Sequence, residues 1–226
     1  MMIKTTILAL DSATDACSVA LWRDGSLAAH RFEARRHGQA EILMPMVRDV
    51  MQESAQEFKT LDGIATTVGP GGFTGLRIGL ASARAMALAA GVPIVGLTTL
   101  EVVAAAQPER SGPLLVAIDS RRSDVYVQLF SPEREPASLP MAIMPGLVES
   151  ILPGGPIVVA GNAAETVLQA LQQTDVSLSN GPALPDAAVL ARIVASCIAP
   201  FQTDLEPPAP LYLRPPDAKL PIEKQA

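Results

Sequence analysis

The strongest constraint on the fold is an internal repeat. Residues 8–22 align without gaps on residues 116–130 at a constant offset of 108, with five identical positions among fifteen. In both copies an apolar, strand-like run ends in Asp-Ser, at Asp11 and at Asp119, and a short turn leads into a second apolar run that ends in an aromatic residue. Self-similarity at a fixed spacing is typical of a repeated structural unit. We therefore expect two lobes that share one pattern.

A polar, turn-rich stretch over residues 107–113 lies between the two copies and predicts the lobe boundary. The chain has 226 residues, of which 49% are hydrophobic, enough for a buried core. We expect an N-terminal lobe over residues 1–106. The C-terminal lobe covers residues 107–226, with a last helix near 185–199 that can pack back on the first lobe, and a proline-rich tail.

Hydrophobic periodicity predicts an α/β class for both lobes. The second lobe reads as a shortened copy of the first, with a strand at 157–162 and a helix at 163–172. The order strand-strand-strand-helix-strand-helix is that of the two-lobed actin-like fold, also called ASKHA or ribonuclease H-like. The elements expected in the first lobe are strands at 3–10, 17–22, 26–32, 63–68 and 93–97 and helices at 37–52, 73–90 and 99–106.

The helix expected at 73–90 follows a glycine-rich loop, with Thr74 as a candidate N-cap. Small residues recur along it every four positions, so one face is nearly bare and another backbone can approach it closely. The sequence leaves open whether that neighbour belongs to this chain or to another protein. The helix at 37–52 is apolar over more than one stripe, which favours a protein-binding surface. The predicted interface residues are Leu43, Val47, Val50, Gly75, Gly79, Ser82, Ala83 and Met86.

Paired strand-Asp-turn units line the nucleotide cleft in actin-like ATPases, so Asp11 and Asp119 are candidates to orient a metal ion in an ATPase or phosphotransferase. Neither turn contains the glycines that let backbone N–H groups approach a phosphate, which favours the interpretation of both aspartates as turn caps. The glycine-rich loop lacks the lysine of a P-loop, but the helix that follows it can hold an anion. A weaker candidate site for an anion or nucleotide therefore comprises Asp11, Gly71, Gly72, Thr74 and Asp119.

Composition argues against several other functions. The net charge of −6 and basic runs of only two arginines predict no tight nucleic-acid binding by the chain alone. His30 and His37 are seven positions apart, a spacing that does not suit a metal site, and the two cysteines are expected to be reduced packing residues. The apolar run before Asp11 is too short for a signal peptide, and Arg77 and Arg84 interrupt the alanine-rich stretch. We expect a cytoplasmic protein without a membrane span, a metal or a catalytic set of its own.

Four segments carry a resemblance to a known family: residues 7–21, 69–79, 118–122 and 210–214. They resemble the TsaB (YeaZ) family of bacterial tRNA threonylcarbamoyladenosine biosynthesis proteins, over residues 3 to about 219. The segment Gly-Pro-Gly-Gly-Phe-Thr-Gly-Leu-Arg-Ile-Gly at 69–79 is the most specific match. The resemblance implies an actin-like fold and a part in making N6-threonylcarbamoyladenosine at position 37 of tRNA. In that system TsaC makes threonylcarbamoyl-AMP, TsaD transfers the group and TsaE is an ATPase.

The resemblance also implies the partners. TsaB is the non-catalytic subunit that TsaD needs, and it pairs with TsaD, or with itself when alone, through two helices that correspond here to residues 37–52 and 73–90. TsaE and tRNA would be reached through the complex, and ATP or ADP and a metal would belong to the complex and not to this chain. The histidine pair that holds the metal of TsaD is not reproduced here. The alternatives are an ATPase or phosphotransferase that uses Asp11 and Asp119 and, more remotely, a peptidase.

Overall fold

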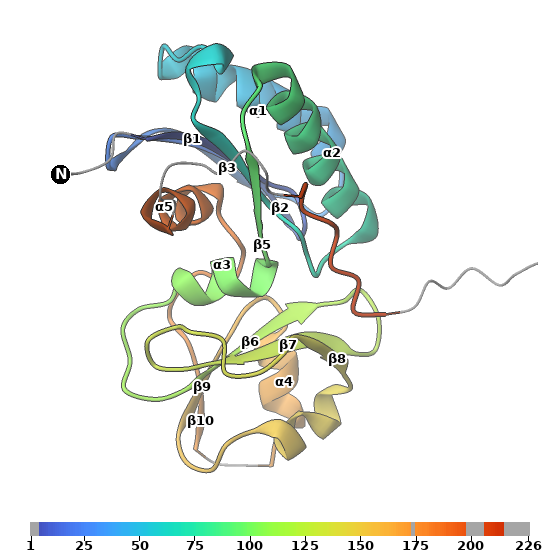
Figure 1. Cartoon of the computed structure of the whole chain (residues 1–226). Coiled ribbons are helices and arrows are strands. Elements are labelled where there is room, and N and C mark those ends of the chain that lie inside the picture. Colours follow the sequence, from blue (N-terminus) through green and yellow to red (C-terminus); the bar gives the residue numbers. More distant parts are fainter. Residues whose placement is uncertain (1–4, 173–174, 198–205, 215–226) are drawn as a thin grey trace, which may run out of the picture.

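The structure, a computed structural model, describes residues 5–172, 175–197 and 206–214 and has two lobes (Figure 1). Each lobe is built on one five-stranded sheet, with the strand order β3-β2-β1-β4-β5 in the N-lobe and β10-β9-β6-β7-β8 in the C-lobe. When the second order is read from β8, the two sheets are the same: an antiparallel meander of three strands, followed by two parallel strands. The repeat and the actin-like fold that it predicted are confirmed.

The N-lobe strands are buried because helices cover both faces of their sheet. All six residues of β1 are buried, which explains why its sequence is an almost unbroken apolar run that ends at Asp11. Residues alternate between the two faces, so Leu8 and Leu10 contribute to one core while Ile7 and Ala9 contribute to another. The strands are β1 Thr6–Asp11, β2 Ala16–Arg23, β3 Ser26–Ala34, β4 Gly63–Thr67 and β5 Ile94–Leu97.

Helices α1 (Gln39–Glu53) and α2 (Phe73–Ala90) lie side by side on one face of the N-lobe sheet, and α5 (Ala187–Cys197) covers the other (Figure 1). The chain therefore returns to the N-lobe after completing the C-lobe sheet. Helix α3 (Thr99–Ala105) starts from a capping box and stands between the lobes. Its side chains pack against both α5 and β6.

The C-lobe repeats the same sheet with shorter elements, since β8 and β10 have three residues each. These two strands and the 3₁₀ turn before β9 are absent from the sequence-based expectation because such short segments carry little periodicity. The elements are β6 Leu114–Asp119, β7 Val125–Phe130, β8 Met141–Ile143, β9 Ile157–Ala160, β10 Val176–Leu178 and α4 Ala164–Ala170, with 3₁₀ turns η1 Phe58–Thr60 in the N-lobe and η2 Pro145–Ile151 in the C-lobe.

One local prediction is wrong. Helix α2 begins at Phe73 with Gly72 as its N-cap, so Thr74 lies inside the helix and does not cap it. The ends of the strand expected at 3–10 and of the helix expected at 185–199 extend outside the described residues. Among the described helices, none is long and apolar enough to cross a membrane.

Candidate functional site

The bare side of α2 is covered by the turn between β1 and β2 of the same chain. The hydroxyl of Ser12 donates a hydrogen bond to the carbonyl oxygen of Gly75, with an O···O distance of 2.8 Å. A Cβ atom on Gly75 would overlap the carbonyl oxygen of Ser12, and one on Gly71 would overlap that of Ala13. The glycines are therefore needed so that the turn can lie directly on the loop and helix. This settles the question left open by the sequence: the close neighbour of the bare face is intramolecular.

This packing corrects the predicted interface. Helices that cover a sheet bury the stripe that faces it, and the predicted residues lie mostly on those buried stripes. An added Cβ on Gly79, for example, would lie only 2.7 Å from the Ser12 hydroxyl oxygen. Two of the eight predicted residues, Gly75 and Ser82, are half-buried. The other six are buried within the chain and cannot meet a partner in this structure: Leu43, Val47, Val50, Gly79, Ala83 and Met86.

The opposite side of the same two helices faces solvent, and we call it the outer helical face. It is defined by the exposed residues Met44, Arg48, Ala81, Ala85 and Leu88. Leu88, in the last turn of α2, is 85% exposed. A groove of about 450 Å³ beside α1 is lined in part by Met44 and Arg48. Sequence reasoning missed these residues, although their position between the buried residues of the helical repeat was a usable signal.

Asp11 ends β1 and is fully buried. Its Oδ1 accepts hydrogen bonds from the Thr67 hydroxyl at 2.5 Å and from the backbone N–H of Ala13 at 3.3 Å. Its Oδ2 is buried with no hydrogen-bond partner among the described residues. Burial raises the pKa of Asp11 to about 7, against the opposing effect of the two hydrogen bonds, and the charge of Asp186 raises it further. A carboxyl group in this state acts as a buried turn cap.

Asp119 occupies the equivalent place in the C-lobe. Its Oδ1 accepts a hydrogen bond from the backbone N–H of Arg121 at 2.7 Å, two residues further on, as Asp11 does from Ala13. The interpretation of both aspartates as turn caps is thus confirmed. Of the other residues in the weaker anion site, Gly71 lies against the β1–β2 turn and Thr74 is exposed on α2. Within the described ranges, no group of three or more His, Cys, Asp or Glu is placed to hold a metal ion.

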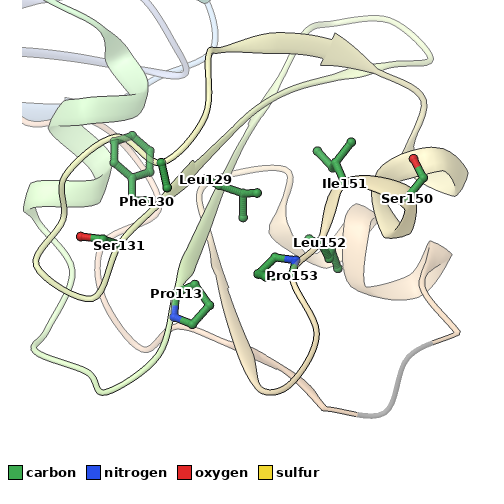
Figure 2. A pocket seen from close by; sticks show the side chains of 9 residues that line it. Pro113, Leu129, Phe130, Ser131, Ser150, Ile151, Leu152 and Pro153 are labelled. Carbon is green, nitrogen blue, oxygen red and sulfur yellow. The ribbon is translucent and has the colours of Figure 1, made fainter.

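A pocket of about 400 Å³ opens in the C-lobe between β7 and the segment that follows η2 (Figure 2). Its lining is mainly apolar, and its only polar side chains are two serines. Such a lining offers no acid, base or metal ligand for catalysis. The residues are Pro113, Leu129, Phe130, Ser131, Ala137, Ser150, Ile151, Leu152 and Pro153.

Fold and site together define a two-lobed actin-like protein whose paired aspartates cap their own turns. Comparison with known proteins agrees with this class. The family model described as TsaD, tRNA N6-adenosine threonylcarbamoyltransferase, matches residues 32–187. The chain belongs to this family and, within it, to the TsaB/YeaZ group.

Three relatives illustrate the match. The protein TsaB of Escherichia coli K12 is 42% identical over 122 residues, which cover 53% of this chain and 52% of that protein. An uncharacterized protein of Mycobacterium tuberculosis is 31% identical over 224 residues, covering 95% of this chain and 94% of its own. The structure of YeaZ from Pseudomonas aeruginosa has a TM-score of 0.78 at 28% identity and covers 92% of this chain and 100% of that one. The chain spans about half the length of the curated TsaB relatives it matches.

Proposed function

We propose that the chain takes part in the biosynthesis of N6-threonylcarbamoyladenosine in tRNA, as the non-catalytic partner of a TsaD-type threonylcarbamoyltransferase. Relatives named tRNA threonylcarbamoyladenosine biosynthesis protein TsaB, from Escherichia coli and Haemophilus influenzae, support the pathway. The observation that carries the role of partner is the outer helical face, where large apolar and very small side chains are exposed together on two adjacent helices.

This face suits docking against a pair of helices. Exposed Ala81 and Ala85 on α2 allow another helix to approach closely, while Met44 and Leu88 supply apolar area and Arg48 a cation. Met and Arg are enriched in protein interfaces, and contiguous exposed apolar side chains usually mark a partner. The same face serves self-pairing when the chain is alone. TsaE and tRNA are reached through the complex, which also supplies ATP or ADP and any metal.

The burial and hydrogen bonding of the two aspartates support the non-catalytic role. Asp11 is buried with a raised pKa, and Asp119 is bonded to the backbone of its own turn. An ATPase or phosphotransferase that used these residues would need them to face a metal and phosphates. The proposal therefore predicts that the isolated chain does not hydrolyse ATP in the presence of magnesium. Hydrolysis that is lost in Asp11→Asn would instead establish the rival function.

Light scattering after size-exclusion chromatography tests the proposed partnership. The purified chain is measured alone and mixed with the TsaD protein of the same organism. We expect a one-to-one complex from the mixture. If both proteins are folded and elute separately at micromolar concentration, the proposed function is wrong.

A further inference from the structure

The segment of residues 206–214, which we call the arm, runs along the N-lobe and ends on the C-lobe (Figure 1, red). The N–H of Leu211 donates a hydrogen bond to the carbonyl oxygen of Val68 at 2.7 Å. Two glycines make room for the arm. A Cβ on Gly96 would overlap Cγ1 of Val68 and lie 2.6 Å from the Cβ of Pro208. One on Gly69 would lie 3.0 Å from Cδ2 of Leu76 and 3.1 Å from the Leu211 oxygen, so both the N-lobe and the arm approach these glycines. The N-lobe surface is thus shaped to hold the arm.

Side chains of α2 also bind the arm. The ring of Tyr212 stacks on that of Phe73 with a centroid distance of 6.0 Å, and its hydroxyl accepts a hydrogen bond from Arg77 at 2.9 Å. The guanidinium of Arg84 donates to the carbonyl oxygen of Pro208 at 2.7 Å. Stacked rings and charge-assisted hydrogen bonds are among the stronger surface contacts. These contacts therefore hold the arm on the N-lobe as far as Tyr212.

Arg214 then crosses to the turn between β6 and β7 of the C-lobe. Its guanidinium donates to the hydroxyl of Ser120 at 3.0 Å, forms an ion pair with Asp124, and lies 5.5 Å from the centroid of the Tyr126 ring. The side chains of Arg214 and Asp124 are 21% and 16% exposed. The ion pair is thus partly shielded from solvent, with a hydrogen bond and a ring beside it, while burial and the nearby charge of Arg122 lower the pKa of Arg214.

A second ion pair joins the lobes at the same turn. Arg121, in the β6–β7 turn, pairs with Asp15, in the β1–β2 turn of the N-lobe. Helix α3 follows directly on β5 and connects the lobes elsewhere, to the left of the arm in Figure 1. Opening of the lobes about α3 would pull the two turns apart and break both ion pairs.

We propose that the arm is a clasp: Arg214, bound to Asp124 and Ser120, keeps the two turns together and holds the lobes closed. The β6–β7 turn binds an arginine of its own chain, and the arm supplies a closing contact of the kind that ligands supply in hinged two-lobed proteins. This inference does not depend on the proposed partnership.

Hydrogen exchange of the full chain, read by mass spectrometry, tests the clasp. In Arg214→Gln we expect amides of residues 119–125 to exchange about tenfold faster. We expect the same for residues 12–16, to which Arg214 makes no hydrogen bond or ion pair within the described structure. Asp124→Asn removes the same ion pair from the other side and should act alike. Lys59→Gln is the matched control, because Lys59 is 78% exposed and pairs with nearby Glu57.

The response of residues 12–16 decides between a clasp and a local contact. Faster exchange there in either variant supports lobe opening. Faster exchange confined to residues 119–125, or no change in either segment, overturns the proposal. Because each variant removes the ion pair independently, one that fails to fold leaves the other to decide the outcome.

Discussion

At the scale of single residues, the buried Asp11 makes the stability of the protein depend on pH. Its pKa is about 7 in the folded chain against 3.8 as the reference value, so the proton is held more tightly in the folded state. The contribution of this proton to the free energy of unfolding is complete below pH 4 and is lost as the pH rises to 7. Above pH 7 the contribution does not change further. The loss from this group is on the order of 4 kcal/mol.

Asp11→Asn should remove this pH dependence, because an amide keeps an acceptor for Thr67 and carries no charge. Urea denaturation at pH 5 and pH 8 measures the effect. We expect the variant to be at least as stable as the wild type at pH 8, with a smaller difference between the two pH values. An equal pH dependence in the two proteins would show that the Asp11 carboxyl is not the group responsible.

Gly75 gives a second prediction at this scale. A methyl group there would overlap the Ser12 carbonyl oxygen, so Gly75→Ala should lower the free energy of unfolding by about 1–3 kcal/mol. Gly146→Ala is the matched control, since nothing lies within 4 Å of an added Cβ at that position. Equal stability of the two variants in thermal unfolding would mean that the β1–β2 turn does not press on α2 as described.

At the scale of elements, α5 is held on the N-lobe by a small polar cluster. Oδ1 of Asp186 accepts a hydrogen bond from the N–H of Ala188 at 2.8 Å and lies 2.8 Å from Nε2 of His30. Asp186→Ala should cost about 1–2 kcal/mol through loss of this cap and its partner. The single tryptophan, Trp22, packs against the core beneath α5, so its fluorescence during urea unfolding reports the loss.

The control for this prediction is Glu165→Ala, an exposed residue in the first turn of α4. It removes a carboxylate near a helix N-terminus without touching α5, and should cost only a few tenths of a kcal/mol. If Asp186→Ala unfolds at the same urea concentration as this control, the cluster does not anchor the helix.

The sequence predicted elements well where the apolar pattern was long. The meander of the first lobe, α2 and the place of Asp11 and Asp119 all follow from periodicity and from the repeat. The short strands β8 and β10 could not be predicted in this way, because three residues are too few to show a hydrophobic period. The prediction of which faces of α1 and α2 are exposed failed for a different reason. On α2, the exposed residues Ala81, Ala85 and Leu88 are also small or apolar, and only packing against the β1–β2 turn shows that the glycine side points inward.

At the scale of the whole molecule, the two lobes have different surfaces for the same topology. The N-lobe carries α1 and α2 with an exposed apolar face, while the C-lobe sheet is covered by α3 and α4. The turns that face each other between the lobes are joined by Arg121 and Asp15 and closed by the arm. These features support the proposal that the protein binds a partner through its N-lobe, while the facing turns of the two lobes make contacts within the chain.

The affinity of the chain for TsaD, compared between two alanine-to-glutamate variants, tests this account most directly. Ala85 is exposed on the outer helical face and Ala183 is exposed in a C-lobe loop, so each substitution adds the same charge without entering a core. Calorimetric titration should show binding at least tenfold weaker for Ala85→Glu and unchanged for Ala183→Glu. Wild-type affinity in both folded variants would contradict docking through the outer helical face.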